Sequence, residues 1–476
     1  MLPVISLTRR SRQMEHLILV VESLSHIPES LFTEDERSFI LHEHKDLEKD
    51  LVSMNRLGFW VFIHFIKPDQ PEAKRLEACR KAGEKTASIL NEHHIRQVYL
   101  FDYENRRSEI LACAEGMALG SYQFRKYRKE KKGAATLKEI GVYSSVITGQ
   151  EVHMMNILLE AVYRCRDWVN EPVSSLNAEK FAHEMETMAK ETGILVEVMN
   201  RKKIESLKMG GILGVNQGSS DPPTFTILEF KSPKARNQKP LVLVGKGIMY
   251  DSGGTNLKPG SSLTGMKNDM SGAAAVASVI YAIARAELPV HVIGLIPATD
   301  NRIGPKSIVP GDIIRTHDGT TIEIIDTDAE GRLILADALS CAKKYDPMLV
   351  IDLATLTGSA IRAIGTFAAA AMQVKAEKEM DRMKESGWIT GERIWEFPMW
   401  EEYGEMMKSD LADLKNLGPA EAGTITAAKF LEKFIDFPWI HLDMAGPAFT
   451  EKRDGYRGQG GTGFGVRLLF NFVQKI

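Results

Sequence analysis

A short acidic segment in the second half of the chain has the residue types of a metal site. It reads Asp326-Thr-Asp-Ala-Glu330-Gly-Arg332 and follows a β-rich run that ends at Ile325. In extended backbone, Asp326, Asp328 and Glu330 would point the same way, because side chains alternate with period two. Three carboxylates on one side repel one another and resist burial unless a cation holds them. We therefore favour metal binding over the alternative of three surface acids.

Two earlier segments also place charged residues where a strand is expected to end. In the first, a buried strand at 241–245 leads into Lys246 and Asp251, and Lys258 follows in the same loop. In the second, Asp269 stands at or near the start of a helix, where an N-cap alone would explain it. Ligands in open α/β sheets bind outside the carboxyl ends of the strands, so we take the three segments together.

Together the three segments carry five carboxylates and three cationic side chains, which leaves a formal charge of −2. One or two divalent ions would offset this negative charge. Oxygen ligands favour Mg²⁺, Mn²⁺ or Zn²⁺, and carboxylates able to bridge are what a two-metal site needs. A lysine could itself be a ligand if the charge of the metals drives off its proton. The chain has no His-Glu-x-x-His motif, and its 12 histidines form no obvious ligand cluster.

The elements around these segments predict an α/β protein with two domains. Residues up to about 145 alternate short β-rich runs with helical stretches, among them 71–92 and 108–131. A further helical stretch, roughly 149–170, ends before Glu171-Pro172 and leads into a longer region with many β-rich runs. We expect a small N-terminal α/β domain (1–147), a connecting helix (148–169) and a larger C-terminal domain (170–476). The larger domain should hold a mixed, mostly parallel sheet covered by helices on both faces.

Composition and charge exclude several classes of protein. The 476 residues carry a formal charge of −3, so no global basic field indicates a nucleic acid or an anionic membrane as partner. No stretch is a plausible membrane span, and the early apolar run is too short for a secretory signal. The four cysteines are scattered, as expected in a reducing compartment, and we expect a cytoplasmic protein.

Two other interpretations remain open at this point. Residues 125–132 contain six Lys or Arg, and the aromatic residues Tyr122, Phe124 and Tyr127 lie before and within this run, as in a nucleic-acid patch. We favour a solvated helix end there, because no recognisable nucleic-acid-binding motif accompanies the run. The acids would also suit a two-metal phosphoesterase, but the histidines or basic groove usual in such enzymes are not evident around them.

Motifs in the longer region resemble those of the leucyl (cytosol) aminopeptidase family of two-metal exopeptidases. The segment TDAEGRL at 327–333 resembles the family signature. Further matching motifs are VGKG at 244–247, DSGG at 251–254, DMSGAA at 269–274, DLATLTG at 352–358, EAGTITAA at 421–428 and HLDMAG at 441–446. The resemblance covers about residues 165–476, while the N-terminal part matches mainly in layout.

This resemblance implies an activity and an assembly. It implies a metal-dependent aminopeptidase that releases the N-terminal residue, with a preference for residues like leucine or methionine, from peptides with a free N-terminus. It also implies a homohexamer in which the N-terminal domain serves oligomerisation or regulation and the C-terminal domain is catalytic. A DNA-binding or regulatory protein on the same scaffold stays an alternative, because some bacterial relatives bind DNA.

The same resemblance assigns the metal ligands. Four side chains would hold the first metal, namely Lys246, Asp251, Asp269 and Glu330. Three would hold the second, namely Asp251, Asp328 and Glu330. Asp251 and Glu330 would therefore bridge. The ions would be Zn²⁺ or Mn²⁺, with Mg²⁺ or Co²⁺ as alternatives.

Other residues are assigned to the reaction and to the substrate by the resemblance. Lys258 would stabilise the oxyanion of the tetrahedral intermediate, and Arg332 would hold a bicarbonate that moves the proton. Met266, Thr355 and Leu356 would line the first side-chain pocket and the amine site.

The sequence departs from the family pattern at four places. Asp326 replaces the Asn that begins the family signature, and Tyr250 replaces the usual Phe. Thr255-Asn256 follows the paired glycines, and Pro419-Ala420 precedes Glu421. An extra acid at 326 could tighten metal binding or raise the pKa of a neighbouring group. None of these changes removes a predicted ligand.

Overall fold

The computed structural model describes residues 2–8, 16–130 and 133–476. The chain forms two compact units. The first comprises Met1–Tyr163 with Glu451–Gln459, and the second comprises Arg164–Thr450 with Gly460–Ile476. The division into residues 1–147, 148–169 and 170–476 stays a prediction.

The first unit is built on a six-stranded sheet with the order β1-β6-β5-β2-β4-β3. All neighbouring strands are parallel except β3 and β4. The strands are β1 (Val4–Leu7), β2 (Leu17–Val21), β3 (Leu51–Asn55), β4 (Trp60–Phe65), β5 (Gln97–Phe101) and β6 (Glu139–Tyr143). The helices are η1 (Leu24–His26), η2 (Glu29–Leu31), α1 (Glu34–Leu41), η3 (His42–Asp46), α2 (Glu72–Glu92), α3 (Arg107–Gly120) and η6 (Gly455–Arg457).

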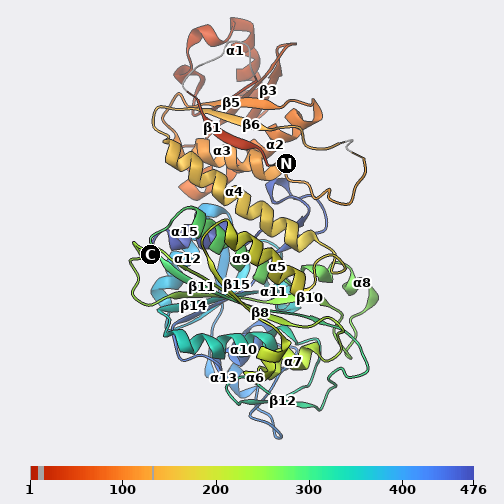
Figure 1. Ribbon diagram of the computed structural model, residues 1–476. Coiled ribbons are helices and arrows are strands. Elements are labelled where there is room, and N and C mark those ends of the chain that lie inside the picture. Colours follow the sequence, from red (N-terminus) through yellow and green to blue (C-terminus); the bar gives the residue numbers. More distant parts are fainter. Residues whose placement is uncertain (1, 9–15, 131–132) are drawn as a thin grey trace. The chain divides into compact units, whose positions relative to one another are not determined.

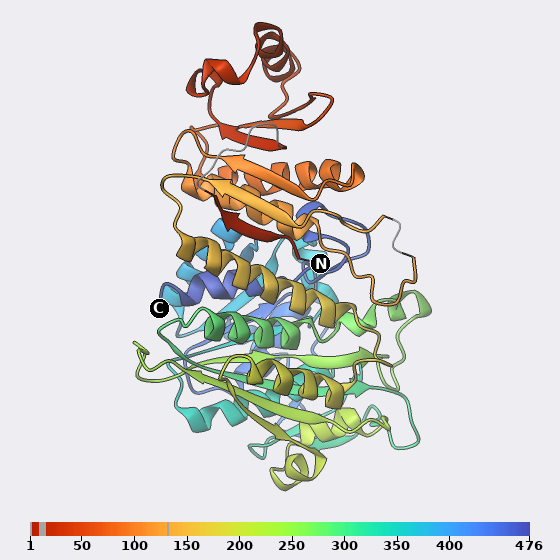
Figure 2. The same ribbon diagram turned by 45° about the horizontal axis from the view of Figure 1, so that its top comes forward.

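Apolar side chains on both faces of this sheet explain its cover of helices. Leu19, Val21 and Ile63 pack with Ile40 of α1 in one buried cluster. The long helices α2 and α3 lie side by side along the sheet (Figure 2). Strands that are buried on both faces are near-continuous apolar runs, as β2 and β4 are.

The helix predicted at 108–131 is shorter in the structure. Helix α3 ends at Gly120, and residues 121–130 form turns and loop. Side-chain hydrogen bonds to backbone carbonyls take the place of helical hydrogen bonds there. The Gln123 side chain donates to Gly133 O, and the Arg125 side chain donates to Glu130 O. The interpretation of the basic run as a helix end is therefore wrong for residues 125–130, and residues 131–132 lie outside the described residues.

Helix α4 (Gly149–Asn170) has the bounds expected from the sequence. It begins in the first unit and ends in the second, since the boundary falls between Tyr163 and Arg164. Among the described residues, no helix combines the length and the apolarity that a membrane crossing requires.

The second unit is built on a nine-stranded sheet with the order β16-β15-β18-β14-β9-β11-β8-β7, and β10 also pairs with β11. The β7/β8, β8/β11 and β15/β18 pairs are antiparallel and the others are parallel. The strands are β7 (Leu195–Met199), β8 (Thr224–Lys231), β9 (Leu241–Gly245), β10 (Gly247–Asp251), β11 (His291–Asn301), β14 (Leu349–Ala354), β15 (Ala369–Val374), β16 (Ile394–Glu396) and β18 (Trp439–Asp443). Smaller sheets pair β12 (Ile313–Arg315), β13 (Thr321–Glu323) and β17 (Leu414–Lys415), and β19 (Phe449–Thr450) with β20 (Gly460–Gly461).

Helices cover both faces of the nine-stranded sheet (Figure 1). One face carries α5 (Ala178–Lys190), α9 (Ser271–Arg285), α12 (Glu377–Thr390) and α15 (Val466–Val473). The other carries α6 (Arg201–Ser206), α7 (Gly210–Asn216), α10 (Gly331–Ala342), α13 (Glu401–Glu405) and α14 (Gly423–Glu432). The remaining helices are α8 (Gly260–Leu263), η4 (Met266–Asn268), η5 (Lys343–Tyr345) and α11 (Gly358–Ile364). The predicted α/β fold, with its mixed and mostly parallel sheet, is confirmed.

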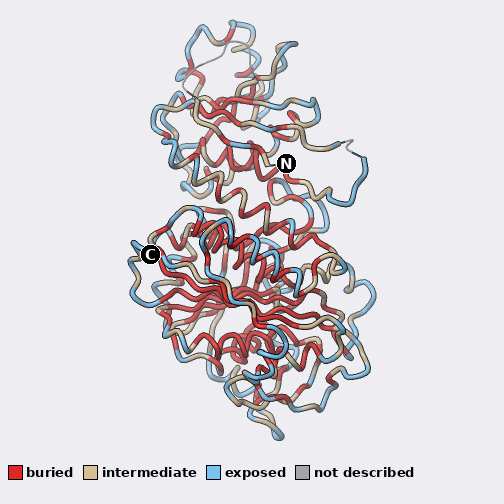
Figure 3. Tube along the Cα trace, viewed as in Figure 1, coloured by how far each residue is buried: buried red, intermediate tan, exposed pale blue. Residues whose placement is uncertain are grey.

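The core of this unit is the central strands and the helices directly on them (Figure 3). Every residue of β9 and of β11 is buried. Helix α9 is buried on all sides over residues 271–284. The reason is a second layer of helices, because α5 and α15 pack on α9 from outside.

Candidate metal centre

Lys246 lies at the break between two strands. Strand β9 ends at Gly245 and β10 begins at Gly247, and both pair with β11 in parallel, so the chain continues along β11 after a break at Lys246. The sequence predicted one strand there, followed by a loop. The flanking glycines leave no room for side chains, since a Cβ at Gly245 would lie 2.6 Å from the Cα of Ala273. Asp251 ends β10, so this second strand carries it to the same edge as Lys246.

Asp269 stands between η4 and α9, two residues before the first residue of that helix. The N-cap of α9 is Met270, so the N-cap explanation of this aspartate is wrong. Its Oδ1 instead accepts a hydrogen bond from the Thr355 hydroxyl at 2.7 Å and lies 2.8 Å from Lys246 Nζ. Asp269 is therefore turned toward Lys246 rather than toward its own helix.

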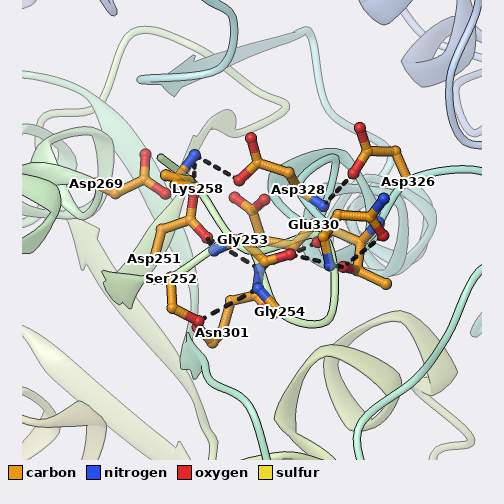
Figure 4. A network of polar contacts seen from close by, with 12 residues as sticks. Asp251, Ser252, Gly253, Gly254, Lys258, Asp269, Asn301, Asp326, Asp328 and Glu330 are labelled. Atoms are coloured by element: carbon orange, nitrogen blue, oxygen red, sulfur yellow. Dashed lines mark hydrogen bonds and ion pairs between the residues drawn. The ribbon is translucent and has the colours of Figure 1, made fainter. Parts of the chain in front are cut away.

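The segment from Asp326 to Glu330 is a turn and not a strand, since β13 ends at Glu323. Asp326 Oδ1 accepts the backbone N–H of Asp328 at 2.8 Å. Asp328 and Glu330 point toward Asp251, whereas Asp326 lies to the side (Figure 4). The expectation that the three acids share one face is therefore wrong for Asp326, because a turn does not alternate its side chains.

Three carboxylates converge at the centre of the site. Asp251, Asp328 and Glu330 offer oxygen atoms that all lie within 4.8 Å of one another. Lys258 Nζ lies 2.7 Å from Asp251 Oδ2 and 2.5 Å from Asp328 Oδ1 (Figure 4). Acids from two distant segments of the chain thus lie together, with Lys258 in contact with two of them.

Lys246 forms the second side of the site. Its Nζ donates to the Thr355 carbonyl at 2.8 Å and lies 2.8 Å from Asp269 Oδ1 and 2.9 Å from Glu330 Oε1. The side chain is buried, with 2% of its surface exposed. Burial opposes the ammonium form, yet the carboxylates of Asp269 and Glu330 raise the pKa of Lys246 overall.

Two acids of the site, Asp328 and Asp269, have raised pKa values. Burial, and then the neighbouring charges of Asp251 and Glu330, raise the pKa of Asp328. Burial likewise raises the pKa of Asp269. Like charges at this spacing and depth are stable only when a proton or a cation offsets them.

Two buried carboxylate oxygens fit a divalent cation. Asp269 Oδ2 and Glu330 Oε2 have no hydrogen-bond partner among the described residues. Burying an anionic oxygen without a partner costs free energy, so each of these atoms needs a cation or a hydrogen-bond donor. Carboxylate oxygens with one amine nitrogen are ligands that Mg²⁺, Mn²⁺ or Zn²⁺ accepts.

Arg332 lies in the first turn of α10, buried beside the acids. Its Nη1 donates to the carbonyl of Asn416 at 2.8 Å, and its Nε has no partner in the described part of the chain. Burial lowers the pKa of Arg332 to about 10, although the charge of Glu330 acts in the opposite direction. A buried guanidinium with an N–H donor to spare fits a small anion such as bicarbonate.

The predicted substrate residues occupy different places. Thr355 touches the site directly, through its carbonyl to Lys246 and its hydroxyl to Asp269. Leu356 packs its side chain against the hydrophobic core. Met266 begins η4 and is half-buried. Of these three predicted residues, the structure therefore brings Thr355 against the ligand side chains.

Four polar residues that support the site were missed in the sequence. Asn301 and Thr327 hold the segments of Asp251 and Asp328, Asn416 holds the turn at Asp326, and Asp443 holds the chain after Thr355. Asn301 and Asp443 each end a buried strand, the same signal that singled out Asp251. That signal could have found these two.

Comparisons with known proteins agree with this geometry. A family model described as the cytosol aminopeptidase family, catalytic domain, matches residues 163–470, and the N-terminal domain model of that family matches residues 70–131. A relative from Chlorobium limicola named "Probable cytosol aminopeptidase" is 46% identical over 389 residues, which cover 76% of this chain and 75% of the relative. A relative of the same name from Chlorobaculum tepidum is 43% identical over 428 residues, which cover 85% of this chain and 84% of the relative.

Solved structures show the same fold. A mutant of tomato leucine aminopeptidase matches with a TM-score of 0.87 and 28% identity, covering 100% of this chain and 97% of that one. The bottromycin maturation enzyme BotP in complex with Mn matches with a TM-score of 0.84 and 28% identity, and the match covers 96% of this chain and 99% of that one. With the family models spanning most of its length, the chain belongs to the cytosol aminopeptidase family of peptide-bond hydrolases.

Proposed function

We propose that this aminopeptidase removes the N-terminal residue, leucine or methionine by preference, from peptides with a free N-terminus, using two divalent metal ions. The convergence of Asp251, Asp328 and Glu330 carries the proposal. With Lys246 and Asp269 on the second side of the site, the donor set divides into two groups that share carboxylates.

The ligands would be shared between two ions. Lys246, Asp251, Asp269 and Glu330 would hold one, and Asp251, Asp328 and Glu330 the other. Two ions bound there would supply Lewis acidity, which lowers the pKa of a water molecule and polarises the scissile carbonyl. The similar structure of BotP is a complex with Mn. For this chain we propose Zn²⁺ or Mn²⁺, with Mg²⁺ or Co²⁺ as alternatives.

Lys246 must change its protonation to serve as a ligand. Its ammonium has three protons, and the Thr355 carbonyl, Asp269 and Glu330 take all three. As a ligand it would give up one proton and present its lone pair, while the Thr355 carbonyl keeps the side chain in place. Lysine suits this role, since its amine deprotonates far more readily than a guanidinium.

Lys258 and Arg332 would act on the developing charges of the reaction. Lys258 Nζ lies among the carboxylates, so it can donate to the oxyanion that forms when a water molecule adds to the scissile carbonyl. Arg332 has a buried N–H donor and would hold a bicarbonate as proton carrier. A protein histidine as general base is not needed in this scheme.

The substrate is proposed to be recognised at its amine and its first side chain. A free α-amine is itself a ligand for a divalent ion, so a peptide with a blocked amine should be a poor substrate. Met266, Thr355 and Leu356 are proposed to line the first side-chain pocket and the amine site. By family resemblance we also propose a homohexamer in the cytoplasm, with the N-terminal domain in assembly or regulation.

The proposal is tested with purified enzyme before and after chelation. We expect Mn²⁺ or Zn²⁺ to restore release of leucine and methionine from their amides, and we expect no release from the N-acetylated forms. Equal cleavage of acetylated and free substrates would contradict recognition of the amine. Full activity in the chelated enzyme would contradict the role of metal ions.

Two substitutions separate metal binding from oxyanion stabilisation. Glu330→Ala should abolish activity, because it removes a carboxylate shared by both proposed sites. Lys258→Ala should lower kcat about a hundredfold and change KM little, if its role is to stabilise the oxyanion. Lys239→Ala is the matched control, since Lys239 Nζ also pairs with an aspartate, Asp346, at 2.8 Å. A Lys258→Ala enzyme with full kcat would contradict the assignment.

A further inference from the structure

Asn301 is the last residue of β11, a strand of eleven buried residues. It lies opposite Asp251 in the parallel pairing of β10 with β11. Its side chain is buried, with 2% of the residue surface exposed. A polar side chain at the buried end of an apolar strand must have a partner for each of its donors.

Both amide protons of Asn301 have a partner in the site. Nδ2 donates to Asp251 Oδ1 at 2.9 Å and to the Thr327 carbonyl at 3.0 Å. Thr327 directly precedes Asp328. A single side chain thus joins the end of β10, which carries one proposed ligand, to the turn that carries another (Figure 4).

These bonds decide which oxygen of Asp251 faces the cations. Asp251 Oδ1 also accepts the Gly253 N–H at 2.9 Å, so two N–H donors occupy this oxygen. Asp251 Oδ2 faces Lys258 at 2.7 Å and is the oxygen left for a cation. Without the amide, the Gly253 N–H alone would hold Oδ1, and rotation about the Cβ–Cγ bond would be less restricted.

The backbone of Asn301 adds to the same link. Its carbonyl accepts the Ser252 N–H at 3.0 Å and the Ser252 hydroxyl at 2.8 Å. Gly254 lies so close that a Cβ there would be 2.8 Å from Asn301 Oδ1. The loop after Asp251 therefore contacts both the backbone carbonyl of Asn301, through Ser252, and its side chain, at Gly254.

Only an amide meets these demands at this place. It offers two N–H donors without charge, whereas an aspartate would place a second anion against Asp251 Oδ1. A serine could donate one hydrogen bond, and an alanine none. The chemistry of the side chain, and not just its size, is thus specified by the two acceptors.

We propose that Asn301 is a positioning residue for the metal centre. It orients Asp251 so that Oδ2 faces the metal ions, and it holds the spacing between Asp251 and Asp328. The inference rests on the proposed two-metal function. It adds a residue that touches neither metal nor substrate and acts through the ligand Asp251.

The test compares Asn301→Ala and Asn301→Ser with a control that is equally buried. Asn216 is fully buried, and its Nδ2 also makes two bonds, to the Asp221 carbonyl at 2.8 Å and to the Thr299 hydroxyl at 3.0 Å. Asn216→Ala therefore removes the same groups at a place without ligands. For each full-length enzyme we measure the Kd for Mn²⁺ by calorimetry after chelation, the Tm of the metal-free protein, and kcat and KM for leucine amide.

We expect Asn301→Ala to weaken Mn²⁺ binding by about tenfold or more and to lower kcat, with KM little changed. Asn301→Ser should fall between the alanine variant and wild type, because it keeps one donor, and it provides the test if the alanine variant does not fold. Asn216→Ala should lower Tm while Kd and kcat stay near wild type.

Two results would overturn the inference. Wild-type Kd and kcat in both Asn301 variants would refute the inference and leave the proposed function standing. Equal losses of Mn²⁺ affinity in the Asn301 and Asn216 variants would do the same. Failure of the wild-type enzyme to bind Mn²⁺ or another divalent ion would instead overturn the proposed function, and the inference with it.

Discussion

Replacing Gly331 with alanine should damage the metal centre while leaving the fold intact. Gly331 is the first residue of α10, directly after Glu330. A Cβ there would lie 2.5 Å from Lys246 Cε and 2.6 Å from Lys246 Nζ. Ordinary contacts begin near 3.4 Å, so the end of the lysine must move by about 1 Å.

That displacement is enough to break the contacts of Lys246. Its Nζ lies 2.8 Å from the Thr355 carbonyl and 2.9 Å from Glu330 Oε1, so a shift of about 1 Å takes it beyond hydrogen-bond range. A misplacement of this size costs about a hundredfold in rate. The fold should survive, because the atoms that must move end a flexible side chain and alanine favours helix over glycine by about 1 kcal/mol.

The assay measures kcat and KM for leucine p-nitroanilide, the Kd for Mn²⁺ and the Tm of the metal-free protein. Gly149→Ala is the matched control, since Gly149 also begins a helix and a Cβ there would meet nothing within 4 Å. We expect Gly331→Ala to lose about a hundredfold in kcat/KM with weaker Mn²⁺ binding, while the control keeps both. A Gly331→Ala enzyme with wild-type Kd and kcat would show that Lys246 is not a ligand held in this place.

Three further substitutions test separate parts of the structure. Asp326→Asn should keep kcat and the Kd for Mn²⁺ within a few fold, because asparagine offers the same oxygen to the Asp328 N–H, whereas Asp326→Ala should weaken Mn²⁺ binding; equal effects of the two would count against this role. Asp443→Ala should lower kcat about tenfold, because Asp443 accepts the Leu356 N–H at 3.1 Å and so fixes the chain after Thr355; unchanged kcat on leucine amide would refute this. Asp337 of α10 has its pKa raised to about 7 by burial, against the effect of the Ile212 N–H. Since this is above the unfolded value of about 3.9, the folded state keeps a proton that the unfolded state loses, and the free energy of unfolding should fall by up to about 4 kcal/mol between about pH 4 and pH 7. Asp337→Asn should flatten that slope in urea unfolding at pH 5 and pH 8, and an unchanged slope would contradict the assignment.

Elements with strong local signals could be predicted from the sequence. Helix α4 has its predicted bounds, because a long helical stretch ends at Glu171-Pro172 and proline disfavours helix in the residue before it. Strand β4 likewise follows a local signal, the apolar run WVFIHF at 60–65. The predicted end of α3 failed because the basic and aromatic residues after Gly120 are compatible with a helix in isolation. Strand β10 was missed because its flanking glycines resemble a loop.

The candidate ligands could be named from the sequence because their chemistry is local. A carboxylate or an amine is a possible ligand wherever it stands, and the short motifs around Lys246, Asp251 and Glu330 carry these groups with the glycines that let backbones approach. These motifs carry more carboxylates than cationic side chains, and this excess of negative charge already indicated a cation.

The tertiary structure decided which of these groups meet and what holds them. Asp326 turns aside because residues 326–329 form a turn, and side-chain direction follows the backbone conformation of the folded chain. Asn301 and Thr355 reach the site from strands or loops far away in the sequence, through pairings of β11 with β10 and of β14 with β9. Such contacts depend on register between distant segments, and only packing of the whole sheet sets that register.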